Sequence, residues 1–314
     1  MGSYCFGIDV GGTSVKCGLF QTDGTLVEKW EIPTRKENNG EKILPDVADT
    51  INHKVAERNM DKKDIIGVGI GIPGPVNNKG EVDRAVNLYW GFKAVSKELS
   101  ELTGLPAKAG NDANVAALGE AWKGAAEGAQ NVMMVTLGTG VGGGIIVDGK
   151  IIAGQHGAGG EIGHALVVRG EKEKCNCGNR GCLEQYASAT GIVRVAGRML
   201  AATEEDSVLR SLDHITAKAV LDAFKDGDKV AVQVMEHVGD LLGGALAGFA
   251  TVTDPETIVI GGGVSKAGQP LIDCIQKYYK KHAFSACKET PIILASLGND
   301  AGIYGSARMV IKEA

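Results

Sequence analysis

The chain has 314 residues, a net charge of −5 and a globular composition, so it can bury a large core without a disulfide framework. Acidic and basic residues are interspersed, which excludes a broad cationic surface for nucleic acid or an anionic membrane. The N-terminus lacks the pattern of a secretory signal, and the uncharged run 128–147 has six glycines, too many for a membrane helix. We expect a cytoplasmic protein that binds small molecules.

The first predicted elements form an antiparallel meander followed by a helix and a buried strand. Alternating apolar residues predict the strands, Asp23-Gly24 predicts a tight turn, and Pro73-Gly74 predicts the end of the last strand. The elements in chain order are strand 4–10, a glycine turn at 11–13, strand 14–21, strand 25–32, helix 42–59 and strand 65–74.

The opening pattern recurs after Asn131, with strand 131–137, a glycine turn at 138–143, strand 144–149 and strand 150–154. Two copies of one unit indicate a duplicated two-domain architecture. The remaining sequence predicts long amphipathic helices, a strand and a closing helix, at 192–203, 230–251, 257–262 and from 302. We place the domains at 1–115, with 299–314 returning to it, and at 116–298.

Two glycine-rich turns lie at equivalent positions of the two repeats. In the first, the backbone N–H groups of 11–13 can face a phosphate while Asp9 faces a cation, although a hairpin without any ligand is an equally good interpretation. The second, 138–143, fits the dinucleotide spacing G-x-G-x-x-G, but a strand follows where that motif requires a helix. With a third cluster at 261–263, the three loops favour one nucleotide site.

A cysteine-rich segment predicts a structural zinc site. His164, Cys175, Cys177 and Cys182 lie within nineteen residues, and three thiolates with one imidazole saturate tetrahedral Zn²⁺. No position remains for a water molecule, so the metal would stabilise its loop and would not act as the catalyst. The alternative is a set of unpaired thiols or a Cys-x-Cys redox pair, which the turn glycines of this loop do not favour.

The sequence resembles known proteins both at the level of a superfamily and at the level of a family. The glycine loops of a duplicated α/β chain resemble the actin-like ATPase (ribonuclease H-like) superfamily, in which a nucleotide lies in an interdomain cleft. The whole chain resembles the ROK family of sugar kinases and repressors, and within it the bacterial glucokinases. This resemblance rests on DVGGT, IGIPGPV, NLYW, GNDAN, LGTGVGGG, GGEIGH, CNCGNRGCLE and IVIGGGV.

The ROK resemblance implies that the protein phosphorylates a hexose with ATP and Mg²⁺, and the glucokinase resemblance implies that glucose is converted into glucose 6-phosphate. It also implies a homodimer or a higher homo-oligomer. It implies that Asp112 is the catalytic base. The implied sugar-binding residues are Gly74, Asn87, Asn111, Asp112, Glu161, His164 and Glu184. The implied nucleotide and metal contacts are Asp9, Gly11, Gly12, Thr13, Lys16, Gly138, Thr139, Gly140, Gly261, Gly262 and Gly263.

Elementary chemistry agrees with these roles but leaves alternatives. A sugar hydroxyl needs a positioned carboxylate to accept its proton during phosphoryl transfer, yet Asp112 could instead be a helix N-cap. The same motifs occur in N-acetylhexosamine kinases, fructokinases and mannokinases, and pocket shape at sugar C2 cannot be read from the sequence. A sugar-sensing regulator would need a helix-turn-helix before Asp9, and a filament or chaperone ATPase would not need the segment 161–184.

Overall fold

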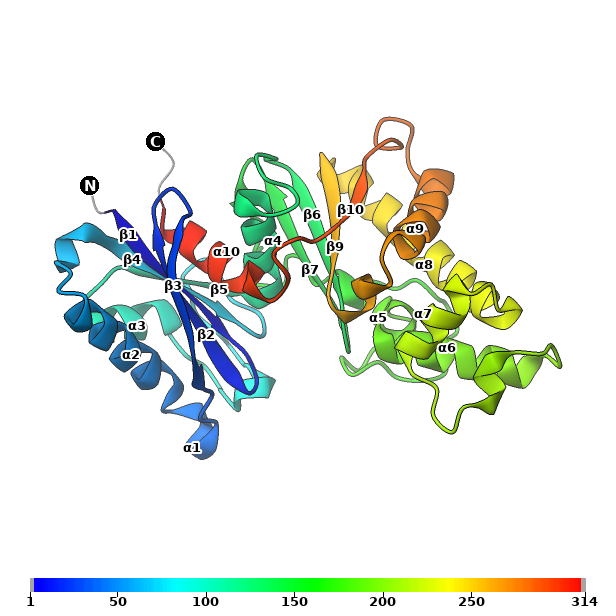
Figure 1. The fold of residues 1–314 in the computed structure, drawn as a ribbon, viewed down its shortest axis with the longest axis horizontal. Helices are drawn as coiled ribbons and strands as arrows, with labels where there is room; N and C mark the ends of the chain where they lie inside the picture. Colours follow the sequence, from blue (N-terminus) through cyan, green and yellow to red (C-terminus); the bar gives the residue numbers. More distant parts are fainter. Residues whose placement is uncertain (1–2, 312–314) are drawn as a thin grey trace. The chain divides into compact units, whose positions relative to one another are not determined.

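The structure is a computed structural model that describes residues 3–311. These residues divide into two compact units, the first made of 3–130, 144–160 and 296–311 and the second of 131–143 and 161–295. No helix of the described part is long and apolar enough to cross a membrane. Figure 1 shows the first sheet in blue to cyan and the second in green to orange, each with helices beside it; the red helix α10 belongs to the first unit.

The first sheet is mixed, with strand order β3-β2-β1-β4-β5. Strands β1 to β3 form the predicted antiparallel meander, while β4 and β5 run parallel to β1. The elements of this part are β1 (Tyr4–Val10), β2 (Ser14–Gln21), β3 (Leu26–Pro33), α1 (Glu37–Gly40), α2 (Ile43–Glu57), β4 (Ile65–Ile72), α3 (Val95–Thr103), β5 (Ala107–Asn111), α4 (Asp112–Lys123) and α10 (Ala301–Val310).

The second sheet repeats this topology. Read from β8, its order is β8-β7-β6-β9-β10, so its strands, numbered along the chain, follow the same third-second-first-fourth-fifth order as those of the first sheet. The predicted duplication is therefore confirmed. The elements are β6 (Val132–Leu137), β7 (Val141–Val147), β8 (Lys150–Ile151), α5 (Glu184–Ala187), α6 (Ala189–Ala202), α7 (Ala217–Lys225), α8 (Lys229–Thr253), β9 (Thr257–Gly261), α9 (Gln269–His282) and β10 (Ile292–Leu294).

One predicted turn is shorter than expected. The sequence predicts a turn over 138–143, whereas β7 begins at Val141. Val141 is buried, and a Cβ on Gly163 would lie 2.1 Å from its carbonyl oxygen. The glycine at 163 thus permits close backbone packing against the start of the strand, a tertiary contact that local glycine content does not reveal.

Helix α10 packs against the first sheet and α4 through glycines. A Cβ on Gly7 of β1 would lie 2.0 Å from the Ile303 carbonyl oxygen, and one on Gly69 of β4 would lie 1.6 Å from that of Ser306. The buried Ser306 hydroxyl donates to the Ile8 carbonyl at 2.7 Å. Because only glycine allows such approach, the last helix completes the core of the first unit.

The contact between α10 and α4 moves the domain boundary beyond the predicted residue 115. A Cβ on Gly119 of α4 would lie 2.3 Å from the Ala301 carbonyl oxygen, and Gly144 of β7 packs equally closely on Ala117 and Ala113. All of α4 and residues 144–160 therefore group with the first unit. The sequence places them in the second domain because it does not show which helix the C-terminal segment meets.

We expect Gly305→Ala to destabilise the protein strongly. The new Cβ would lie 1.7 Å from the Val115 carbonyl oxygen and 2.8 Å from the Gly119 nitrogen, which are backbone atoms that cannot rotate away. Separating α10 from α4 should lower the free energy of unfolding by about 3 kcal/mol or more. Denaturant unfolding measures this loss.

Gly248→Ala provides the matched control in a helix. Gly248 is exposed on α8, and a Cβ there meets no atom within 4 Å. Alanine has the higher helix propensity, so this variant should gain up to about 1 kcal/mol. Equal stability changes in both variants would contradict the packing explanation.

Candidate active site and metal centre

The first glycine turn joins β1 to β2 in the first unit. Asp9, near the end of β1, is paired across the ladder with Lys16, and the Gly11 N–H donates to the Ser14 carbonyl at 3.0 Å to close the turn. Burial raises the pKa of Asp9, and Lys16 opposes that rise. Gly12 and Thr13 are exposed at the tip. A partly buried carboxylate beside an exposed glycine turn suits a cation and a phosphate.

Two neighbouring elements hold this turn in place. The Lys16 amino group donates to the Asn299 carbonyl at 3.1 Å, and a Cβ on Gly302 would lie 2.5 Å from Asp9 Cγ. The beginning of α10 therefore lies directly against the Asp9 carboxylate. The sequence predicts Asp9 and Lys16 as ligand contacts, but it does not reveal that the C-terminal helix supports them.

The candidate base lies where β5 meets α4. Asn111 ends β5 and caps α4, because its Oδ1 accepts from the Asn114 N–H at 3.1 Å. Its Nδ2 donates to the Gly74 carbonyl and to Asp112 Oδ1, both at 3.1 Å. The Ala113 N–H also donates to Asp112 Oδ1, at 2.8 Å. Asn111 therefore has the capping role that was the alternative for Asp112, and it orients the Asp112 carboxylate.

Asn114, which the sequence analysis did not select, supports this arrangement. It is buried, and its Nδ2 donates to the Gly159 carbonyl at 2.9 Å, while its Oδ1 accepts from the Ile145 N–H at 3.4 Å. The spacing of three residues from Asn111 is the signal that could have found it. Asn87, in contrast, is exposed on a short 3-10 helix, Val86–Leu88, whose buried Leu88 anchors it.

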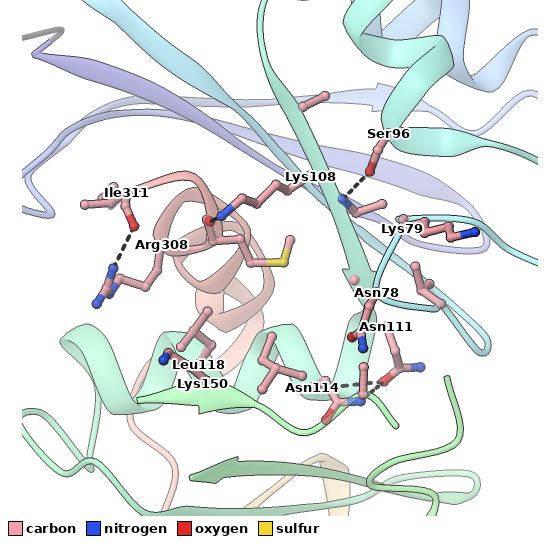
Figure 2. A pocket seen from close by; sticks show the side chains of 18 of the residues that line it. Asn78, Lys79, Ser96, Lys108, Asn111, Asn114, Leu118, Lys150, Arg308 and Ile311 are labelled. Atoms are coloured by element: carbon pink, nitrogen blue, oxygen red, sulfur yellow. Dashed lines mark hydrogen bonds between the residues drawn. The ribbon is translucent and has the colours of Figure 1, made fainter. Parts of the chain in front are cut away.

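A cavity of about 560 Å³ adjoins β5 on the side shown in Figure 2. Asn111 and Asn114 line it, but Gly74, Asn87 and Asp112 do not. The amides of both asparagines are already engaged in the hydrogen bonds described above. Of the basic lining residues, Lys79, Lys108 and Lys150 are exposed and Arg308 is partly buried. The cavity is thus a neighbour of the base and not the predicted sugar site.

The four predicted zinc ligands lie together in the second unit. One ligand atom from each of His164, Cys175, Cys177 and Cys182 lies within 4.8 Å of the others. Cys177 Sγ and Cys182 Sγ are 3.7 Å apart, and Cys175 Sγ is 3.8 Å from His164 Nδ1. Zinc–sulfur bonds of about 2.3 Å in a tetrahedron place two sulfurs about 3.8 Å apart. The donor set therefore fits a closed, four-coordinate zinc site.

The three thiols of the cluster differ in the direction in which their pKa values are shifted. Burial raises the pKa of Cys175 and raises that of Cys182 to about 12. For Cys177 burial is outweighed by the Asn179 backbone and by the neighbouring thiols, so its pKa is lowered. A bound divalent cation would deprotonate all three, since thiolates are the ligating form.

His164 presents its two ring nitrogens to different partners. Nδ1 faces Cys175, whereas Nε2 lies 3.9 Å from the Glu161 carboxylate. If Nδ1 ligates zinc, Nε2 must carry the proton and can donate a hydrogen bond. Glu161 precedes the short 3-10 helix Ile162–His164 and His164 ends it, and both are partly exposed. The pair offers an acceptor and a donor to a hydroxylated ligand.

Glu184 connects the metal cluster to the second glycine turn. Its Oε1 lies 3.7 Å from Cys175 Sγ, and its Oε2 accepts from the Val141 N–H at 3.1 Å. A Cβ on Gly140 would lie 2.3 Å from the same oxygen. Gly140 is therefore required for the close approach of this carboxylate, in addition to any phosphate contact.

The second and third glycine clusters meet in the second unit. Gly138 and Thr139 precede β7, and Gly261 ends β9, which is parallel to β6. Gly262 has φ +85°, and a Cβ on it would lie 2.5 Å from the Leu137 carbonyl oxygen, directly before the second turn. Gly262 and Gly263 are exposed. The structure thus brings together the two loops that sequence analysis assigns to the nucleotide in this unit.

The chain is similar to known proteins over almost its whole length. The family model that matches residues 5–313 is the ROK family. A glucokinase of Halalkalibacterium halodurans is 43% identical over 312 residues, which cover 98% of this chain and 94% of that protein. A glucokinase of Thermotoga maritima is 36% identical over 313 residues, covering 98% and 96%.

Solved structures show the same similarity. The ROK family glucokinase of Streptomyces griseus, in complex with glucose and AMPPNP, has a TM-score of 0.73 and 34% sequence identity, with 98% of each chain covered. The two repeated α/β units are those of the actin-like ATPase fold, and the chain is a kinase of the hexokinase type. It belongs to the ROK family.

Proposed function

We propose that this kinase transfers the γ-phosphoryl group of ATP to the 6-hydroxyl of a hexose and that glucose is its preferred sugar. The observation that supports this most is the Asn111–Asp112 pair, in which a carboxylate is oriented by a capping amide at a strand end. The full-length similarity to glucokinases supports the choice of sugar.

In the proposed step, the Asp112 carboxylate accepts the proton of the 6-hydroxyl as its oxygen attacks the γ-phosphorus. The bond from the γ-phosphorus to the bridging oxygen breaks, ADP leaves with that electron pair, and a hexose 6-phosphate forms. Asn111 holds the carboxylate in orientation through its 3.1 Å hydrogen bond.

Sugar hydroxyls each donate and accept, so recognition requires fixed groups of both kinds. We assign this role to Asn87 and the Gly74 backbone in the first unit, and to Glu161, His164 and Glu184 in the second. The Glu161–His164 pair and the backbone-bound Glu184 support this assignment, since each is held by a contact within its own unit.

The remaining assignments concern phosphates and metals. We assign phosphate contacts to the N–H groups of the first and second glycine turns and nucleoside contacts to residues 261–263. Asp9 is the carboxylate that suits Mg²⁺, which would neutralise phosphate charge. Zinc would stabilise its loop and place His164. The seven cysteines form no disulfide, which suits a reducing compartment such as the cytoplasm.

A panel of hexoses tests the proposal. In a coupled assay of ADP release, glucose should exceed mannose, fructose, allose, N-acetylglucosamine and N-acetylmannosamine in kcat/KM by at least about tenfold, which is the discrimination that one substituent usually gives. Preference for an N-acetylhexosamine would refute the choice of glucose. ADP release that no sugar accelerates would refute hexose phosphorylation itself.

A further inference from the structure

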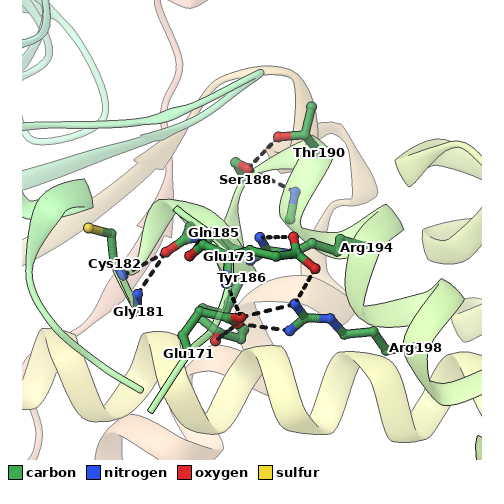
Figure 3. A network of polar contacts seen from close by, with 11 residues as sticks. Glu171, Glu173, Gly181, Cys182, Gln185, Tyr186, Ser188, Thr190, Arg194 and Arg198 are labelled. Carbon is green, nitrogen blue, oxygen red and sulfur yellow. Dashed lines mark hydrogen bonds and ion pairs between the residues drawn. The ribbon is translucent and has the colours of Figure 1, made fainter. Parts of the chain in front are cut away.

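The segment 165–183, here called the zinc loop, is fixed by ion pairs that involve no metal ligand. Arg198 on α6 donates to both carboxylate oxygens of Glu171, at 2.8 and 3.1 Å, and to Glu173 at 2.7 Å. Arg194, one turn earlier, pairs with Glu173 at 3.2 Å. Figure 3 shows both arginines reaching from one helix to the two glutamates. Two basic residues on one helix face thus bind one side of the loop.

Glu171 is the most enclosed member of this network. Its side chain is 5% exposed, and it also accepts from the Tyr186 hydroxyl and from the Glu173 N–H, the latter at 3.0 Å. The Arg198 guanidinium is the main cause of its lowered pKa, so the carboxylate stays ionised at neutral pH. A buried carboxylate that loses its cation is costly, whereas the intact, hydrogen-bonded pair fixes one geometry.

Gln185 joins the middle of the zinc loop to its C-terminal end. Its Oε1 accepts from the Gly181 and Cys182 N–H groups, at 2.7 and 3.2 Å, and its Nε2 donates to the Glu173 carbonyl at 3.1 Å. The Gln185 side chain is buried, and the Arg194 guanidinium donates to the Gln185 backbone carbonyl. One amide therefore holds the segment before Cys175 and the segment that contains Cys182 at a fixed separation.

The same helix segment continues to the second glycine turn. Glu184, beside Gln185, binds the Val141 N–H, the Ala189 N–H donates to the Gly138 carbonyl at 2.8 Å, and the Thr190 hydroxyl donates to the Thr139 carbonyl at 3.0 Å. The zinc loop and the glycine turn are thus attached to one rigid support, α5 and the beginning of α6.

We propose that Arg198, Glu171 and Gln185 form a clamp that sets the zinc loop in its ligating geometry before metal binds, and that they are positioning residues for Glu184 and the second glycine turn. The metal-binding half of this inference rests on the proposed zinc site. Because protein contacts already order the loop, zinc need not fold it, in contrast to small domains that are unfolded without metal. The clamp instead slows zinc release and, together with the metal, keeps the hexose contacts in place.

Zinc release to a chromogenic chelator, measured beside the KM for glucose, tests the clamp. Arg198→Met should accelerate release and raise KM by about 10- to 100-fold each, as loss of supporting contacts does around metal sites. Arg198→Lys, which keeps one charge but loses the paired hydrogen bonds, should fall between this variant and the wild type. Arg198→Met leaves the buried Glu171 carboxylate without its cation. If that variant does not fold, Gln185→Met provides the same comparison and leaves the Glu171–Arg198 pair intact.

Lys218→Met is the control, since it removes an exposed ion pair with Asp222 on α7, and it should change neither value. The clamp is refuted if Arg198→Met and Gln185→Met release zinc and bind glucose within twofold of the wild type. A wild-type protein without zinc would refute the zinc site alone. Hydrogen exchange of residues 165–183 would then still test the clamp, with faster exchange expected in both variants and unchanged exchange contradicting it.

Discussion

Asp112→Asn lowers kcat by about 10²–10⁴-fold while glucose still binds, because an amide cannot accept the proton of the attacking hydroxyl. The substitution keeps an acceptor oxygen for the Ala113 N–H and the Asn111 amide, so the junction of β5 and α4 should stay folded. Steady-state kinetics with ATP and glucose measures kcat, and calorimetry measures sugar binding.

Asp213→Asn is the matched control. Asp213 is an exposed aspartate in the second unit, and the same loss of one charge there should leave kcat unchanged. If Asp112→Asn turns over at a near-normal rate, Asp112 is not the base. If Asp112→Asn unfolds and loses sugar binding, the amide at position 112 disrupts the hydrogen bonds around Asn111. In that case the kinetics of Asp112→Ala decide the assignment.

Cys175→Ala loses zinc and activity together. The wild-type protein should contain about one equivalent of zinc per chain, since four donors saturate a tetrahedral site. Without the Cys175 thiolate, His164 and Glu184 lose their common neighbour, and kcat/KM for glucose should fall by at least about 100-fold, beyond the usual effect of supporting residues. Elemental analysis and kinetics on one preparation measure both.

Cys274→Ala separates the metal effect from the loss of a buried thiol. Cys274 lies in α9, outside the cluster, and its thiol donates to the Met235 carbonyl at 3.2 Å. This variant should keep its zinc and its activity. A metal-free Cys175→Ala protein with full activity would show that the cluster has no part in placing the sugar contacts.

Local patterns sufficed for the first two strands. The bounds of β1 and β2 agree with prediction because alternation and the intervening glycines act over a few residues. The convergence of His164 with the three cysteines was predicted for a similar reason, since donor type and spacing indicate a zinc site without reference to a fold. Asn111, by contrast, was predicted as a sugar contact, and its capping of α4 appears only with the helix.

Contacts between distant segments were not predictable from the sequence. Glu120 looks like a surface glutamate in its helix, yet it is fully buried and accepts from the Ser296 and Leu297 N–H groups. The Glu171–Arg198 pair joins residues 27 apart whose charges look like those of solvated surfaces. Such partners become visible only when chain segments pack, so their roles depend on tertiary structure.

Phosphorus NMR of the product formed from glucose and ATP tests the central claim most directly. The wild-type enzyme should produce one hexose 6-phosphate for each ADP, with no phosphate released before sugar is added. The absence of a phosphorylated sugar, or ADP and free phosphate formed at the same rate with and without glucose, would contradict it.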